Sequence, residues 1–81
     1  MRFFFTERFR TSYADAPAAV QRQCDKQLSY LARDLRHPSL KTKKFDEVRG
    51  IWQARVNRSW RFYFLVSADT YTLLDIIPHP K

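Results

Sequence analysis

The sequence feature that most constrains the fold is an alternation of apolar and polar residues between positions 50 and 66. A period of two residues is typical of β-strands that are buried on one face only. The stretch therefore predicts two neighbouring strands joined by a turn at residues 57–59. The apolar members of the alternation are Trp52, Ala54, Val56, Trp60, Phe62, Phe64 and Val66.

The polar face of this predicted hairpin carries two arginines, Arg55 and Arg61. A guanidinium group fits phosphate oxygens with two parallel hydrogen bonds, so a pair of them on one face favours an anionic ligand. An ordinary solvated sheet face is the alternative interpretation of either arginine alone, and a solvated loop is the alternative for the nearby lysines. The predicted phosphate-binding residues are Lys41, Lys43, Lys44, Gln53, Arg58 and Tyr63.

The charge of the chain supports an anionic partner. Fifteen Lys and Arg residues against eight Asp and Glu residues give a net charge of +7 in 81 residues. Such a balance favours nucleic acid over an acidic protein or an anionic membrane.

The length predicts a single domain over residues 1–81. One cysteine, Cys24, excludes an intramolecular disulfide, and no spacing of residues predicts a metal or another cofactor. Neither a signal peptide nor a transmembrane run is expected, which predicts a cytoplasmic protein.

The other segments predict an α+β fold with the order β-α-α-β-β-β, in which two helices pack on one face of a small, mostly antiparallel sheet. An aromatic strand at residues 2–5 precedes a helix capped by Thr6, and a second helix extends from Pro17 towards Pro38. The apolar stripe of the second helix is Val20, Cys24, Leu28, Leu31 and Leu35.

Two further segments complete the predicted sheet. Residues 37–50 lack periodicity and are expected to form an exposed connection that ends at Gly50, the sole glycine, in a positive-φ conformation. Residues 71–77 predict a last strand with Thr72, Leu74 and Ile76 on the apolar face. Apolar side chains left on the uncovered face predict a surface for a protein partner. These partner-binding residues are Leu65, Tyr71, Leu73 and Ile77.

The exit Pro38-Ser39-Leu40 from the long helix, the segment Gly-Ile-Trp-Gln-Ala-Arg-Val at 50–56 and Trp-Arg-Phe-Tyr-Phe at 60–64 resemble the RelE/ParE superfamily of bacterial type II toxins. The resemblance covers nearly the whole chain and is closest to the YoeB/RelE-like branch. It implies a metal-independent endoribonuclease that cuts mRNA in the A site of the 30S ribosomal subunit by attack of a ribose 2′-hydroxyl on the adjacent phosphate. It also implies a co-expressed antitoxin, and we expect the free toxin to be monomeric.

By position, Arg55 and Arg61 match the phosphate-binding and transition-state arginines of that superfamily. His79 is the acid–base candidate, because imidazole exchanges protons near neutral pH, and Lys81 is expected to assist electrostatically. The predicted catalytic set is Arg55, Arg61, His79 and Lys81, with Asp75 and Glu47 as the nearby carboxylates.

The chain departs from the family pattern, because Gln53 replaces a lysine of one branch and the tail has no terminal tyrosine. Two alternatives therefore stay open. One is a ParE-like poison of DNA gyrase that cuts nothing itself. The other is a catalytically lapsed module that binds nucleic acid on the same fold.

Overall fold

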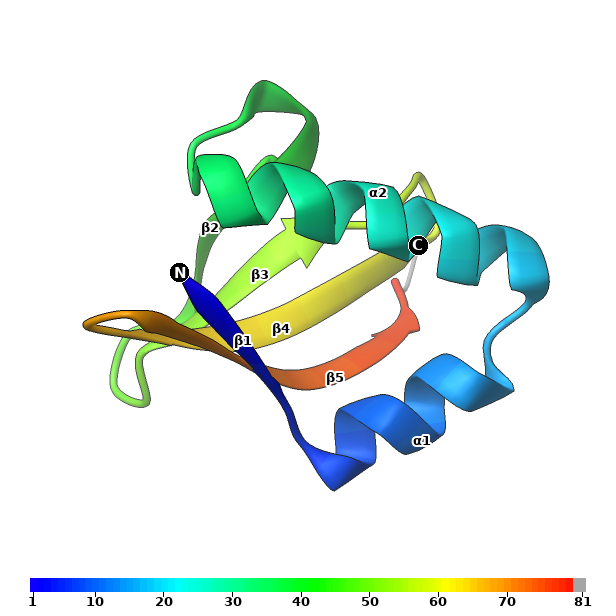
Figure 1. Ribbon diagram of the computed structural model, residues 1–81, viewed down its shortest axis with the longest axis horizontal. Helices are drawn as coiled ribbons and strands as arrows, with labels where there is room; N and C mark the ends of the chain where they lie inside the picture. Colours follow the sequence, from blue (N-terminus) through cyan, green and yellow to red (C-terminus); the bar gives the residue numbers. More distant parts are fainter. Residues whose placement is uncertain (80–81) are drawn as a thin grey trace.

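The structure is a computed structural model that describes residues 1–79 (Figure 1). Two helices pack on a five-stranded sheet with the strand order β1-β5-β4-β3-β2, in which β1 and β5 are parallel and the other pairs antiparallel. This is the predicted α+β fold with one strand more than expected. The elements are β1 (Arg2–Phe5), α1 (Glu7–Asp15), α2 (Ala18–Arg33), the 3₁₀-helix η1 (Pro38–Leu40), β2 (Lys43–Asp46), β3 (Ile51–Arg55), β4 (Trp60–Ser67) and β5 (Thr70–Pro78).

The helices follow the predicted pattern closely. Thr6 caps α1, because its Oγ1 accepts a hydrogen bond from the backbone N–H of Phe9 at 3.1 Å. The same hydroxyl donates to the carbonyl oxygen of Leu73 at 2.8 Å, which ties the start of α1 to β5. Helix α2 ends at Arg33, before the expected stop at Pro38, so Leu35 lies beyond the helix and is only half-buried. The other stripe residues, Val20, Cys24, Leu28 and Leu31, are buried as predicted.

The core lies between the helices and one face of the sheet. Helix α2 crosses that face, and α1 packs beside β5 (Figure 1). The largest fully buried side chains are Phe62, Phe64, Leu31, Leu40, Leu73, Ile76 and Cys24. Within residues 1–79, no helix combines the length and the apolar character needed to cross a bilayer.

Strand β5 does not keep the predicted alternation. Tyr63 pairs with Asp75 but Phe64 pairs with Leu73, so Leu74 is an extra residue that forms a β-bulge. The bulge turns the preceding residues inward: Tyr71 is 5% and Leu73 is 0% exposed. The prediction that these two side chains lie on the uncovered face, accessible to a partner, is therefore wrong.

The segment 37–50 contains an element that the sequence did not reveal. Strand β2 pairs antiparallel with β3, with Lys43 opposite Gln53 and Lys44 opposite Trp52. Its four residues carry no apolar alternation, and charged residues are typical of edge strands, where they discourage pairing with other chains. Gly50 has φ of 69°, as predicted, and this conformation sets the start of β3.

Candidate functional site

The two predicted arginines lie directly opposite each other in the β3–β4 ladder, Arg55 against Arg61. Directly opposed residues have Cβ atoms about 5 Å apart and project from the same face of the sheet. We call this the outer face; it is the side opposite the core and carries Gln53, Arg55, Arg61, Tyr63 and Asp75. Both arginine side chains are half-buried on it.

Arg61 is held in place by the turn between β3 and β4. Its Nη1 donates to the carbonyl oxygens of Asn57 at 2.6 Å and Trp60 at 2.9 Å. Burial and the neighbouring positive charge of Arg55 lower the pKa of Arg61 below its usual range. An anion bound between the two guanidinium groups would relieve this repulsion, so the pair is electrostatically suited to a phosphate.

The end of β3 is positioned from within the core by Gln27. This residue is 4% exposed, and its Nε2 donates to the carbonyl oxygens of Arg55 at 2.7 Å and Ser39 at 3.0 Å. This role of Gln27 is not among those predicted from the sequence. The available signal was that Gln27 occupies a position within the apolar stripe of α2, where a polar side chain requires hydrogen-bond partners.

His79 lies at the same end of the sheet as the two arginines. The β4–β5 ladder continues to the pair Trp60 and Pro78, and the N–H of His79 then donates to the carbonyl oxygen of Ser59 at 2.6 Å. The exposed His79 therefore follows β5 directly beside the turn that anchors Arg61. Arg58 is exposed in that turn, whereas Lys81 lies outside the described residues.

Tyr63 occupies the centre of the outer face. Its hydroxyl donates to Oε1 of Gln53 at 3.3 Å, and its ring packs edge-on against Phe45 at 4.8 Å between centroids. Burial raises the pKa of the Tyr63 phenol, an effect that Arg61 opposes and Asp75 reinforces. Gln53 is only 6% exposed because β2 and Tyr63 flank it. The structure therefore assigns Gln53 a supporting contact to Tyr63 and does not present it as the predicted phosphate ligand.

The nearby carboxylates are less suitable as bases. Asp75 lies on the outer face, but its Oδ2 is 3.3 Å from Nε of Arg8, and its Oδ1 accepts from the N–H of Ile76. Glu47 is exposed in the β2–β3 connection. Among the predicted acid–base groups, His79 is thus the one that the pairing of β4 with β5 places at the end of the sheet where Arg55 and Arg61 lie.

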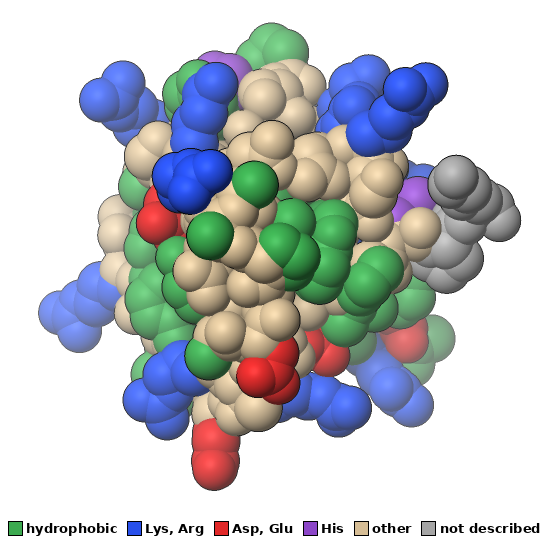
Figure 2. Space-filling view, turned by 90° about the vertical axis from the view of Figure 1, so that its right-hand side faces the viewer, with side chains coloured by type: hydrophobic (Ala, Val, Ile, Leu, Met, Phe, Trp, Pro, Cys, Tyr) green, Lys and Arg blue, Asp and Glu red, His purple; other side chains and the backbone are tan. Residues whose placement is uncertain are grey.

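The predicted lysine cluster does not form a single patch. Because side chains alternate along β2, Lys43 lies with Gln53 on the outer face, whereas Lys44 lies on the opposite face, with its Nζ 5.0 Å from the centre of the Trp52 ring. Lys41 follows η1 with φ of 47°. Figure 2 shows Lys and Arg side chains spread around the whole outline of the molecule. The opposed arginines, and not a local excess of charge, therefore single out the candidate site.

The accessible apolar residues of the outer face form a shallow groove next to this site. Of the predicted partner residues, Leu65 is half-buried and Ile77 is 37% exposed. A cavity of about 380 Å³ extends from Ile77 across the face to β2. Its lining includes Phe45, Ile51, Tyr63, Leu74 and Ile77.

Comparisons with known proteins support the fold. No family model matches the sequence, and no curated protein matches it in sequence. Solved structures do match over nearly the whole chain. A YoeB/ParE toxin from Agrobacterium tumefaciens gives a TM-score of 0.81 at 16% identity, covering 99% of this chain and 100% of that one.

Two further solved structures give the same result. The YoeB dimer from Staphylococcus aureus gives a TM-score of 0.81 at 14% identity, covering 99% of this chain and 98% of that one. A chain of the RelB–RelE antitoxin–toxin complex from Methanococcus jannaschii gives a TM-score of 0.77 at 14% identity, covering 93% of this chain and 88% of that one. The protein has the fold of the RelE/ParE superfamily of toxins.

Proposed function

We propose that this protein is the toxin of a type II toxin–antitoxin system and that it cleaves mRNA in the ribosomal A site. The observation that carries the proposal is the direct opposition of Arg55 and Arg61 on the outer face. The fold supports it, since the similar solved structures are YoeB, RelE and YafQ toxins. The net charge of +7 is consistent with a polyanionic substrate.

In the proposed reaction, a ribose 2′-oxygen forms a bond to the adjacent phosphorus while the bond from phosphorus to the 5′-oxygen breaks. The products are a 2′,3′-cyclic phosphate and a free 5′-hydroxyl. Arg55 and Arg61 would hold the phosphate oxygens and stabilise the negative charge that develops on them. The anchoring of Arg61 to the turn keeps one guanidinium fixed before substrate binds, which reduces the reorganisation needed in the transition state.

The reaction also moves two protons, one from the 2′-hydroxyl and one to the leaving 5′-oxygen. His79 is proposed for one of these transfers, because it follows β5 beside the turn that holds Arg61. Tyr63 lies on the same face as Arg61, and its hydroxyl donates to Gln53, so donation to the phosphate would require that hydrogen bond to be exchanged. Lys81 keeps the electrostatic role expected from the sequence.

An antitoxin is the proposed protein partner. Solved structures similar to this chain include RelB–RelE and YoeB–YefM complexes of a toxin with its antitoxin. The positive charge favours an acidic antitoxin segment, and the groove that contains Ile77 offers it apolar contacts. The monomeric state of the free toxin stays a prediction.

The test is induced expression of the wild type beside Arg55→Ala and Arg61→Ala, with primer extension on an abundant mRNA. Removal of a charge-stabilising donor in such a site lowers the rate by a factor on the order of 10² to 10³. We expect A-site cuts with the wild type and their loss with both variants. The matched control is Arg22→Ala, which removes the same charge from an exposed position on α2 and should leave the cuts unchanged.

Growth arrest with intact transcripts and an induced DNA-damage response would contradict the proposal and favour the gyrase alternative. RNA binding without growth arrest or cleavage would favour the catalytically lapsed module. Circular dichroism of the purified variants separates a loss of the site from a loss of the fold.

A further inference from the structure

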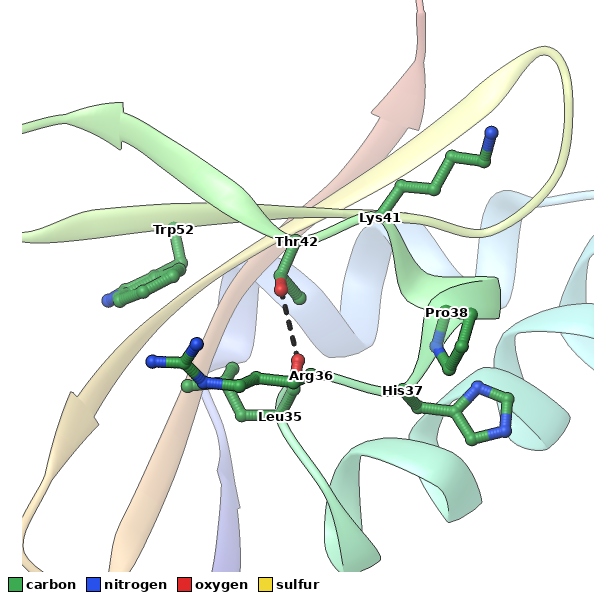
Figure 3. A pocket seen from close by; sticks show the side chains of 7 residues that line it. All are labelled: Leu35, Arg36, His37, Pro38, Lys41, Thr42 and Trp52. Atoms are coloured by element: carbon green, nitrogen blue, oxygen red, sulfur yellow. Dashed lines mark hydrogen bonds between the residues drawn. The ribbon is translucent and has the colours of Figure 1, made fainter.

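A second pocket is shown from close by in Figure 3. It lies on the opposite side of the sheet from the arginine pair, because Trp52 and Arg55 project from alternate faces of β3. It has a volume of about 360 Å³ and is formed by the α2–β2 connection and the Trp52 side chain of β3. Figure 3 shows the Arg36 guanidinium and the Trp52 indole extending to the same side of the pocket, with Leu35 below them, whereas the Lys41 side chain points away from Trp52. We call it the Trp52 pocket.

The walls of the Trp52 pocket are preorganised by local hydrogen bonds. Thr42 Oγ1 donates to the carbonyl oxygen of Leu35 at 2.9 Å, which closes the connection on itself. His37 Nδ1 accepts from the N–H of Ser39 at 3.1 Å and so caps η1. The His37 ring stacks on Tyr30 of α2, 3.9 Å between centroids and 4° from parallel. The pocket wall is thus fixed to the helix layer without a ligand.

The chemistry of the pocket suits a nucleotide. Among the described residues that line it, none is acidic, and the basic side chains of Arg36 and Lys41 are exposed. Trp52 is only partly buried, and Lys44 lies over its ring. An aromatic surface combined with cationic side chains is the usual means of binding single-stranded nucleic acid, in which bases stack and phosphates pair with cations. The volume falls within the range of small-ligand pockets.

The edge strand β2 connects this pocket to the outer face. Lys43 lies on the outer face and Lys44 on the pocket side, so cations follow the edge from one face to the other. Neighbouring strands are about 4.8 Å apart, and β2 is the last strand on this side of the sheet. The path from Arg55 around the edge to Trp52 is therefore short enough for a few nucleotides.

We infer that the Trp52 pocket binds one nucleotide of a single-stranded RNA whose other nucleotides occupy the Arg55–Arg61 site. Phe64 packs against the Trp52 ring at 6.4 Å between centroids, so the base takes the place that Lys44 Nζ holds over the ring, beside Arg36. The displaced Lys44 and the neighbouring Lys43 then contact the phosphates that follow around the edge. The inference rests on the proposed function in taking RNA as the ligand and the Arg55–Arg61 site as the place of its other nucleotides; it does not require that the RNA is cut.

The test measures Trp52 fluorescence in a Trp60→Phe background, which leaves Trp52 as the remaining one of two tryptophans. The probe is a short 2′-O-methyl oligoribonucleotide, which lacks the attacking hydroxyl and stays intact during titration. We expect saturable quenching, and about tenfold weaker binding in R36Q/K44Q, because one base-stacking contact and its cation are lost. The matched control, R10Q/R22Q, removes two exposed charges from α1 and α2 and should bind within about twofold of the parent.

Several results would overturn the inference. The first is Trp52 fluorescence that does not change at saturating RNA. The second is RNA binding weakened equally in R36Q/K44Q and R10Q/R22Q, because that would show that RNA is attracted by the overall positive charge and not by the pocket. Quenching by an acidic peptide but not by RNA would identify a protein site instead. The Arg55→Ala variant separates the two proposals: it should lose cleavage but keep the Trp52 quenching. Quenching by RNA, combined with intact transcripts during expression of the wild type, would refute the nuclease and leave the pocket assignment standing.

Discussion

The two faces of the sheet are held by different forces, although they share the same strands. On the core face of β4, Phe62 and Phe64 are completely buried. On the outer face, the alternating residues Arg61 and Tyr63 are half-buried and positioned by hydrogen bonds. Apolar burial thus supplies the stability on one side, while the other side retains polar groups for binding. Substitutions at adjacent positions should therefore separate stability from activity.

The largest effect is expected from Phe64→Ala. Truncation of a fully buried phenylalanine leaves a cavity and costs about 3–5 kcal/mol of unfolding free energy. Tyr63→Ala, one position away on the outer face, should cost less than about half as much, because its ring is only partly buried. Urea denaturation of both variants measures the difference. Equal losses would contradict the division between the faces.

A smaller effect on stability distinguishes the two arginines. Arg61 donates two hydrogen bonds to turn carbonyls, so Arg61→Ala should lower the unfolding free energy by about 1–3 kcal/mol. No side-chain hydrogen bond of Arg55 is found within residues 1–79, and Arg55→Ala should change stability by less than about 0.5 kcal/mol. Denaturation midpoints check this. Cleavage should be lost in both, which makes Arg55→Ala the cleaner probe of the site.

Gly50→Ala tests the strand register that separates the faces. The position is open, with no atom within 4 Å of an added Cβ, so the cost arises from the φ of 69° alone. A left-handed conformation costs about 1–2 kcal/mol in a residue with a side chain. Thermal denaturation should show this loss with the fold retained. Stability equal to that of the wild type would mean that β3 forms without the left-handed backbone conformation at position 50.

The smallest effect is expected in the helix layer, at a hydrogen bond between α1 and α2. The Tyr13 hydroxyl donates to Asp25 Oδ1 at 2.7 Å, and this hydrogen bond, with burial, raises the pKa of Tyr13 from 10.0 to about 12. The hydrogen bond from the Tyr13 phenol therefore makes its full contribution to the unfolding free energy below pH 10, and this contribution is lost as the pH rises through 12.

Asp25→Asn should return the Tyr13 titration towards 10 and remove part of the stability loss between those pH values. Ultraviolet absorbance of the phenolate follows the titration directly. Asp15→Asn, at an exposed position of α1, is the matched control and should leave it unchanged. A Tyr13 titration unaffected by Asp25→Asn would show that burial, not the hydrogen bond, is the main cause.

The sequence predicted the elements whose periodicity is unambiguous. The alternation at 50–66 placed Arg55 and Arg61 on one face because a short turn leaves little freedom in the pairing of its strands. In the segment 73–77, every residue except Asp75 is apolar, so both faces of the strand look alike in sequence. The alternation of apolar and polar residues therefore could not locate the bulge at Leu74. Strand β2 has almost no apolar residues and forms through pairing with β3, which local sequence does not report.

The same limit applies to the site. The opposition of the arginines follows from local pairing, whereas the contact of Gln27 with the end of β3 joins residues 28 positions apart. The split of the lysines between two faces follows from the existence of β2, which the sequence of residues 37–50 does not indicate. Contacts between residues that are distant in sequence are thus the part of the site that the sequence alone does not predict.

The parallel pairing of β1 with β5 has a consequence for synthesis. Thr6 bonds to Leu73, 67 residues later, and β1, at the border of the sheet, has β5 as its sole neighbour. During translation the first strand emerges early and must wait for the last, so closure of the sheet is a late event with a large loop entropy. A truncated chain that ends before residue 70 lacks β5, which pairs with both β1 and β4. Its sheet is therefore incomplete, and β1 has no strand to pair with.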